Sequence, residues 1–580
     1  MANSLGTHVD APGAPGWRRS PVLWLTLLAA LIFALRLIAP PNLLDQDQER
    51  PAAYVLDVVK NANWICQRDV FGDVTSKPPL FTWVAAVITL AAGEANEFSL
   101  YLPGALATWG TALLVFFAGR RHFGEQGGVF AALAGFLCYA GFKAFGLART
   151  DAVFMFTVTA TALLGWRAWS RGRGWMGFWL MAGLATLTKG PLGLVLGASG
   201  LLAAAWEKRS GHSQPLRGSH WPGILTYLAL TAGWFGLAYG TLGQPLIDKM
   251  LGRELVGHIA SKRSGFPGSL FWQPPLYYLG RAAPWSVFAF WGLWRVLRQP
   301  AVRPEERRFE RFLFCWFVVG IAIFGLSTHQ RADLLWPLLP AASLLAGREL
   351  ARWTRRWQPP AVRRATLAVT ALILAGFAYH YFGPAARKNL IPETVAVRNL
   401  AREVIAAGGR EFPLTHVDSP YAFQYYLNTL RPLVTAERAA ALLRGSEPVF
   451  VAVTDPGILE SHRLPGDPPL KIVLPAPDTA PPVPVRIVSN YPEFAVRDRV
   501  AFAFGDCDVR LADARLVSVT QRGYVLQGLA GAPRATFTNV SEKPITVRVR
   551  WQGTPARAPE VRTLAPGETW EVAGPPVRAG

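Results

Sequence analysis

The sequence predicts an α-helical polytopic membrane protein with two small soluble domains at its C-terminal end. Apolar residues make up 51% of the 580 residues, and they form blocks that are separated by charged joints. Basic residues gather in every second joint, which is typical of a chain that crosses a membrane repeatedly. Beyond residue 383 the long apolar blocks end and shorter, alternating segments begin.

A membrane span needs ~20 apolar residues, or somewhat fewer where flanking side chains help, and this rule predicts about eleven transmembrane helices. The first block begins at Pro21, follows Arg18 and Arg19, and lacks a small-residue cleavage site. We therefore expect an uncleaved membrane helix and a cytoplasmic N-terminus. The predicted spans are residues 21–39, 104–119, 128–147, 152–166, 175–189, 191–206, 222–241, 275–294, 311–327, 333–348 and 365–382.

The positive-inside rule orients these spans. With residues 1–20 in the cytoplasm, the basic joints after residues 119, 166, 206, 294 and 347 all face inward. The outward joints are then 40–103, 148–151, 189–191, 242–274, 328–332 and everything after residue 383. We expect a multi-pass protein of a bacterial inner membrane, with its polar site residues and C-terminal domains on the extracytoplasmic face.

The net charge of +21 does not indicate a nucleic-acid-binding protein, because the excess arginines lie in short joints between apolar blocks. Four cysteines are too few for a disulfide framework.

The predicted domains are a cytoplasmic N-terminus (1–20), a membrane domain (21–382), an α/β domain (383–484) and a small β-sandwich-like domain (485–580). Within the membrane domain, loop 40–103 is expected to be ordered, with helices near 50–63 and 80–93, the second of them interfacial. Loops of this length are usually functional.

The outer loop opens with the run Asp45-Gln46-Asp47-Gln48-Glu49-Arg50. A carboxylate at the membrane surface can take a proton from an attacking hydroxyl, which makes Asp47 a candidate general base. An equally weighted alternative is that Asp47 caps the helix that follows.

Three further cations and a carboxylate are candidates. Lys77 precedes two prolines and can hold a phosphate, or it can reach lipid headgroups. Arg149 and Asp151 form a charged pair between two apolar blocks, and ionisable residues there are functional candidates, although a structural ion pair is the alternative. Lys189 is a weaker outer candidate.

The remaining weaker candidates on the outer face are Glu254, His258, His329 and Arg331. Glu254 with the two histidines has ligand types that suit a metal, but histidines so far apart in the sequence are weak evidence, and we expect no metal. No glycine-rich phosphate loop or dinucleotide fingerprint is present, so no nucleotide cofactor is expected.

Together these residues resemble the protein O-mannosyltransferase and aminoarabinose (lipid A) transferase group of GT-C glycosyltransferases, over roughly residues 20–350. The family pattern Asp-Glu-x-Arg-Tyr-Ala is similar to residues 47–52, and Lys-Pro-Pro-Leu stands at residues 77–80. Asp151 matches the family's acidic residue at the head of the fourth span. Weaker landmarks stand in the family's order at residues 188–191, 283–286 and 335–340.

The resemblance implies a membrane glycosyltransferase that moves a sugar from a polyprenyl-phosphate carrier to a lipid, glycan or protein acceptor, with inversion and without a metal. It implies that Asp47 and Asp151 are catalytic, and that Arg50, Lys77 and Arg149 bind the donor phosphate. Asp45, Glu49, Lys189, Glu254, His258, His329 and Arg331 are then possible substrate-binding residues.

The chain departs from the family pattern at Pro51, Ser76 and Tyr101, where members often have tyrosine, glutamate and arginine. These departures leave the sugar and the acceptor open.

The main alternative is a lipid or sugar transporter or flippase. A transporter would normally place ionisable residues near the membrane midplane, within broken helices or repeats, whereas here they lie at one face. A non-catalytic scaffold and an oligosaccharide-transferring relative are further alternatives.

Overall fold

The structure is a computed structural model. It describes the chain from residue 20 onward, apart from residues 46, 213–214, 251, 253–270, 328–329, 388–389, 409–413, 446–448, 468, 476–482, 491–516, 523–529, 532–533, 540–543, 550–559, 575–576 and 579–580. The chain divides into two compact units, residues 1–395 and 396–580, and each is described by itself.

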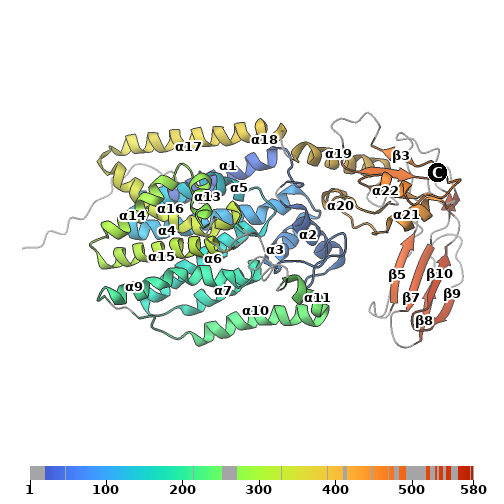
Figure 1. Ribbon diagram of the computed structural model, residues 1–580, viewed down its shortest axis with the longest axis horizontal. Helices are drawn as coiled ribbons and strands as arrows, with labels where there is room; N and C mark the ends of the chain where they lie inside the picture. The colour runs from blue at the N-terminus through green and yellow to red at the C-terminus, as the bar shows by residue number, and fades with distance from the viewer. Residues whose placement is uncertain are drawn as a thin grey trace, which may run out of the picture. The chain divides into compact units, whose positions relative to one another are not determined.

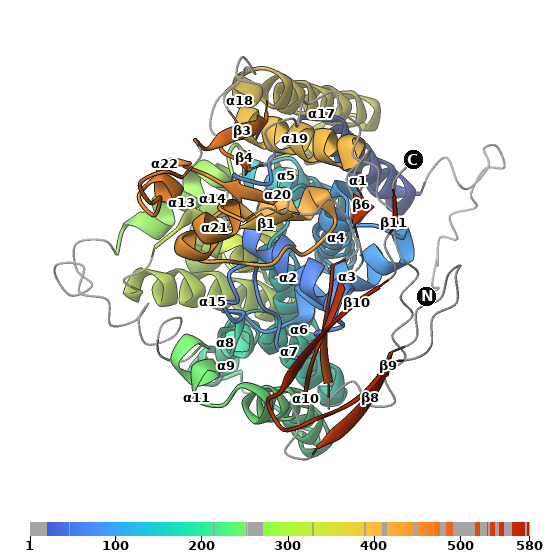
Figure 2. The same cartoon turned by 90° about the vertical axis from the view of Figure 1, so that its right-hand side faces the viewer.

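The first unit is a bundle of helices. In Figure 1 its long helices run side by side, with α10 and α17 at opposite edges and the short α2, α3 and α11 at one end. Figure 2 views the same helices end-on. They are α1 (Pro21–Ile38), α2 (Glu49–Asn61), α3 (Leu80–Ala92), α4 (Glu97–Phe136), α5 (Tyr139–Ala144), α6 (Thr150–Arg171), α7 (Trp175–Lys189), α8 (Leu192–Ser199), α9 (Ala203–Arg209), α10 (Trp221–Leu242), α11 (Gln244–Ile247), α13 (Gln273–Arg281), α14 (Ser286–Arg298), α15 (Pro304–Leu326), the 3-10 helix η4 (Ala332–Leu338), α16 (Leu339–Trp353), α17 (Pro359–Phe382) and α18 (Pro384–Arg387).

The helical fold class is confirmed, and each predicted span overlaps at least one helix. Five helices in the described part of the chain are long and apolar enough to cross a membrane: α1, α4, α6, α15 and the segment Pro359–Arg387. The count of eleven stays a prediction. The expected helices at 50–63 and 80–93 are confirmed as α2 and α3.

Two predicted spans are interrupted. The span 275–294 is divided into α13 and α14 at residues 282–285, because Pro284 has no backbone N–H and restricts the residue before it. The span 128–147 ends its long helix at Phe136, and α5 follows as a separate short helix. This break matters for the site, because α5 carries Lys143.

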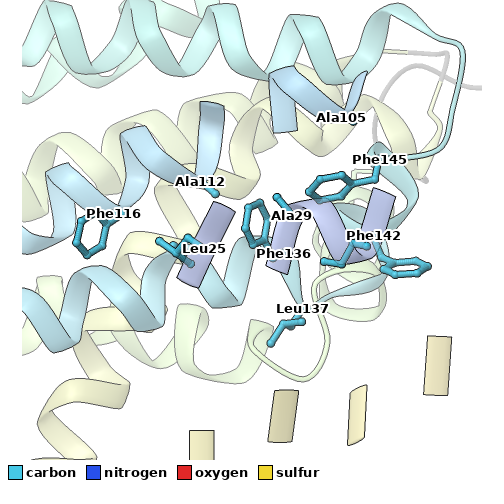
Figure 3. Close-up of a cluster of buried hydrophobic side chains, with 11 residues drawn as sticks. Leu25, Ala29, Ala105, Ala112, Phe116, Phe136, Leu137, Phe142 and Phe145 are labelled. Atoms are coloured by element: carbon cyan, nitrogen blue, oxygen red, sulfur yellow. The ribbon is translucent and has the colours of Figure 1, made fainter. Parts of the chain in front are cut away.

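An apolar core joins α1, α4 and α5. Leu25 and Ala29 of α1 lie among the aromatic rings of Phe116, Phe136 and Phe145, all of them buried (Figure 3). The ring of Phe142 stacks on Phe377 with centroids 3.9 Å apart, which attaches α17 to this core. Burying each such side chain stabilises a soluble fold by about 2 kcal/mol, whereas in lipid the gain comes mainly from packing.

The second unit contains a four-stranded sheet in the order β1-β2-β4-β3. Its strands are β1 (Leu414–His416), β2 (Phe450–Val453), β3 (Lys471–Leu474) and β4 (Arg486–Ser489), and its helices are α19 (Ile391–Gly408), which begins in the first unit, α20 (Tyr421–Leu427), α21 (Ala436–Leu443) and α22 (Gly457–Glu460). β1 and β2 are parallel and the other pairs are antiparallel, so the expected strand and helix alternation is present. β4 begins at residue 486, after the predicted start of the last domain at residue 485, yet it belongs to this sheet.

The remaining described strands form small antiparallel sheets. β7 (Arg534–Asn539) pairs with β5 (Val517–Arg522) and β10 (Thr569–Ala573). β8 (Ile545–Val549) pairs with β9 (Glu560–Leu564), and β6 (Ala530–Gly531) pairs with β11 (Val577–Arg578). Whether these sheets pack as a sandwich stays a prediction.

Candidate active site

Asp47 lies in the turn before α2, with a left-handed backbone (φ 57°). Arg331 Nη2 donates to Asp47 Oδ2 at 2.7 Å, and the Asp47 side chain is 68% exposed. The hydrogen bond from Arg331 holds the pKa of Asp47 below its ordinary value of 3.8 against the effect of burial, and the charges of Arg331, Arg149 and Lys77 lower it further. Asp47 is therefore an ionised carboxylate that solvent can reach.

The helix-cap alternative for Asp47 is wrong. α2 begins at Glu49, its N-cap is Gln48, and no side chain makes a capping hydrogen bond there. The Asp47 carboxylate is instead directed to a cation from a segment 284 residues away.

Gln48 fixes this turn in place. Its side chain is fully buried, and its Nε2 donates to the carbonyls of Asn42 (2.7 Å) and Asp45 (2.9 Å). Its Oε1 accepts from the backbone N–H of Ala148 at 2.8 Å. One amide group thus connects the turn that carries Asp47 to the turn that carries Arg149.

Asn42 continues this connection into the helices. Its Oδ1 accepts from Arg36 Nη2 and from the Tyr101 hydroxyl, both at 2.8 Å. Arg36 is the buried cation in the last turn of α1, and its guanidinium lies 5.0 Å from the centre of the Tyr101 ring. The outer loop is therefore anchored to α1 and α4 by buried polar contacts, which are costly to leave unpaired.

Asp151 lies in the first turn of α6, where a carboxylate suits the positive end of the helix dipole. α6 and α7 form an antiparallel hairpin, so Lys189 at the end of α7 meets Asp151 at the start of α6. Lys189 Nζ lies 2.5 Å from Asp151 Oδ1, and Arg149 Nε lies 3.0 Å from Oδ2. Asp151 is 3% exposed, so both of its oxygens are held by cations away from solvent.

Asp333 extends the chain of charges. Its Oδ2 accepts from Arg149 Nη1 at 3.0 Å and from Lys143 Nζ at 2.8 Å. The side chains of Asp333, Lys143 and Arg149 are 8–10% exposed. Ion pairs therefore run in sequence from Lys143 through Asp333, Arg149 and Asp151 to Lys189.

Lys77 lies just before α3, and its charge acts on both Asp47 and Asp151. Among the described residues, the site contains five cations (Lys77, Lys143, Arg149, Lys189 and Arg331) and three carboxylates (Asp47, Asp151 and Asp333). The excess is two positive charges. Such an excess suits an anionic group, and lysine and arginine both bind phosphate, lysine as a point charge and arginine through paired hydrogen bonds.

The other candidates are placed differently. Arg50 Nε lies 3.3 Å from Oδ2 of Asp69, a buried carboxylate of the same loop whose pKa burial raises, so Arg50 helps to hold the loop. Hydrogen bonds of its backbone N–H and carbonyl hold Asp45 in the turn before α2, and Glu49 is the first residue of α2. Their binding roles stay predictions.

Glu254, His258 and His329 lie outside the described residues. Among the residues that the structure describes, no group of three His, Cys, Asp or Glu side chains is placed to hold a metal ion. The expectation of a metal-free site stays a prediction.

Sequence reasoning missed Gln48, Lys143 and Asp333. Asp333 had a usable signal: it follows Arg331 by two residues at the head of a predicted span, as Asp151 follows Arg149. Gln48 had none, since an uncharged side chain in a charged run gives no sign of its partner.

Comparisons with known proteins agree with this fold. The sequence model of the family described as dolichyl-phosphate-mannose-protein mannosyltransferase matches residues 76–235. Undecaprenyl phosphate-alpha-4-amino-4-deoxy-L-arabinose arabinosyl transferases from Pseudomonas fluorescens and Pseudomonas aeruginosa are 24% and 25% identical over 337 and 378 residues. These alignments cover 56% and 61% of this chain, and they span 59% and 65% of those relatives.

The crystal structure of ArnT from Cupriavidus metallidurans bound to undecaprenyl phosphate is similar to this chain, with a TM-score of 0.62 and 18% identity. The similarity covers 83% of this chain and 99% of that one. The chain therefore shares the GT-C fold of that structure, and its sequence is similar to the mannosyltransferase family model and to the arabinosyl transferases.

Proposed function

We propose that this protein transfers a sugar from a polyprenyl-phosphate carrier to an acceptor hydroxyl, on the extracytoplasmic face of a bacterial inner membrane. One observation carries the proposal: an ionised, exposed carboxylate, Asp47, shares a site with an excess of partly buried cations. The first can accept a proton and the second can stabilise a leaving phosphate.

In the proposed reaction the acceptor oxygen attacks the anomeric carbon of the sugar. Asp47 takes the proton of the hydroxyl as the new C–O bond forms. The bond between the anomeric carbon and the phosphate oxygen breaks, and its electron pair leaves with polyprenyl phosphate. Attack opposite the leaving phosphate inverts the anomeric configuration.

The cations act on the leaving group. Lys77 and Arg149 are the proposed phosphate ligands, since their charges act on Asp47 and therefore lie near it. Negative charge grows on the phosphate as the bond breaks, and preorganised cations beside a low-dielectric membrane stabilise that change strongly. We propose that these side chains supply the positive charge, without a metal ion.

We propose a different role for Asp151. Both of its oxygens are already occupied by Lys189 and Arg149 and it is 3% exposed, so it suits holding those cations better than accepting a proton from a substrate.

The names of the relatives guide the choice of substrate. The curated relatives are named for undecaprenyl phosphate and 4-amino-4-deoxy-L-arabinose, and the family model is described for dolichyl-phosphate-mannose and protein. A polyprenyl phosphate is common to both descriptions. We propose such a lipid-linked sugar as the donor, and a lipid, glycan or protein hydroxyl as the acceptor.

The test is transfer of labelled sugar from synthetic polyprenyl phosphates by the purified protein in lipid, with a membrane extract as acceptor. Asp47→Asn should lower the rate ~10²- to 10⁴-fold. Asp73→Asn is the matched control, because Asp73 is a 57% exposed carboxylate of the same loop that pairs with Lys249, and it should keep wild-type transfer.

Near-normal transfer by Asp47→Asn would show that Asp47 is not the base. A folded wild-type protein that transfers from no carrier would refute the glycosyltransferase proposal. The same labelled lipids in vesicles would then test for flipping.

A further inference from the structure

One short segment makes ion pairs with both the proposed base and a proposed phosphate ligand. Arg331 and Asp333 are two residues apart at the start of η4. Arg331 pairs with Asp47, the proposed base, and Asp333 pairs with Arg149, a proposed phosphate ligand.

Asp333 binds two cations through a single oxygen. Lys143 Nζ and Arg149 Nη1 both approach Oδ2, at 2.8 Å and 3.0 Å, while Oδ1 is buried without a hydrogen-bond partner. Lys143 comes from α5, the short helix that breaks the predicted span. Three separate elements therefore meet at this carboxylate.

We propose that Asp333 is a positioning residue for the donor phosphate: it fixes the guanidinium of Arg149, and Lys143 is its balancing cation. This inference rests on the proposed function. Neither Asp333 nor Lys143 needs to touch the substrate.

The geometry of Arg149 supports this role. A guanidinium is planar, so holding two of its nitrogens fixes the direction of the third. Asp151 holds Nε and Asp333 holds Nη1, which leaves Nη2 for another acceptor. A phosphate oxygen is an acceptor that suits this nitrogen.

The charges explain why Lys143 is present. Two carboxylates around Arg149 alone would leave a net negative centre that repels a phosphate. Lys143 and Lys189 compensate them, so the chain of three cations and two carboxylates keeps one positive charge. The carboxylates can therefore orient Arg149 without cancelling its attraction for an anion.

The competing explanation is purely structural, since a buried ion pair can serve only to hold helices together. The two explanations predict different effects of losing the pair on the binding of a charged lipid and of an uncharged lipid. A structural defect weakens binding of both, whereas a misdirected Arg149 weakens binding of the phosphate alone.

The experiment measures equilibrium binding of undecaprenyl phosphate and of undecaprenol to the full-length protein in lipid nanodiscs. The variant is Asp333→Asn with Lys143→Gln, which removes one charge of each sign and keeps the net charge of the chain. The matched control is Glu207→Gln with Arg311→Gln, which removes a buried ion pair, 2.6 Å long, that joins α9 to α15.

We expect the Asp333 and Lys143 variant to bind undecaprenyl phosphate roughly 10- to 100-fold more weakly, the range of one charged hydrogen bond. Its binding of undecaprenol should be unchanged, and the control should bind both lipids as the wild type does. If the double variant does not fold, Asp333→Glu keeps the charge, moves the contact with Arg149 and should show the same selective loss.

Three results would overturn the inference: unchanged binding of the phosphate, equal weakening of both lipids, or a wild type with no preference for the phosphate. The transfer assay separates this inference from the proposed function. Selective loss of phosphate binding in a protein that transfers no sugar would support Asp333 as a positioning residue and refute the transferase.

Discussion

Replacing Gln48 by methionine tests whether the two turns of the site depend on one amide group. Methionine has a similar length and keeps the apolar contacts, but it loses both donated bonds and the accepted bond from Ala148. At about 1 kcal/mol for each bond, the free energy of unfolding should fall by about 3 kcal/mol. Denaturation of the protein by titration with sodium dodecyl sulfate measures this loss.

Gln67 is the matched control. It is also fully buried, lies in the same loop, and donates to the carbonyls of Asn63 and Trp64 at 3.1 Å and 2.6 Å. Gln67→Met loses these two bonds, so it should lower the free energy of unfolding by about 2 kcal/mol. Its partners lie within the loop, so the positions of Asp47 and Arg149 should not change.

Activity then separates the two variants. A shift of about 1 Å between a base and a bound substrate can cost about 10²-fold in rate. Gln48→Met should therefore lower sugar transfer ~10- to 100-fold under conditions where the protein stays folded, and Gln67→Met should keep nearly all of it. Equal activity in the two variants would refute the idea that Gln48 aligns the two turns.

Three further predictions concern the charges of the site. Lys189→Met should lower the free energy of unfolding by about 2 to 4 kcal/mol, since Asp151 keeps only Arg149 as a partner, and Lys189→Arg should restore most of it in the same titration. Arg331 lowers the pKa of Asp47, so this carboxylate stays ionised as the pH falls from 7 toward 5, and kcat/KM should show no loss from this group in that range. Arg331→Met should raise the pKa of Asp47 toward 3.8 and move the acid limb of the pH profile upward. An acid limb that does not move would contradict the pairing. Transfer should persist after dialysis against EDTA, and activity that returns only with an added divalent ion would contradict the proposed role of the cations.

The helices were predictable because each apolar block between polar joints is long enough to form one. The errors lie where local chemistry interrupts an apolar block. Pro284 divides α13 from α14 inside a block that composition alone reads as continuous. Gly124, with a φ of 82°, is non-helical and separates two helices within the range Glu97–Phe136, as the separate predicted spans 104–119 and 128–147 imply.

The site was predictable only where charges cluster in the sequence. Asp47 and the pair of Arg149 and Asp151 stand out because they lie in short polar joints. Lys143 lies within a predicted span, and its partner Asp333 is 190 residues away. A sequence gives no distance between such residues, so a single charge in an apolar block cannot be assigned a partner before the fold is known.

Asp47 and Asp151 have similar sequence settings, each beside a basic residue at a membrane surface, yet the fold gives them opposite environments. Asp47 is 68% exposed with one partner, Arg331, whose own side chain is 43% exposed. Asp151 is 3% exposed between two cations that are 10–12% exposed. An acceptor hydroxyl can displace an exposed arginine at little cost, because such surface pairs contribute about 0–1 kcal/mol. Opening the buried cluster would leave a charge unpaired, which costs about 3 to 5 kcal/mol. This difference supports the proposal that Asp47 takes the proton and that Asp151 orients the cations.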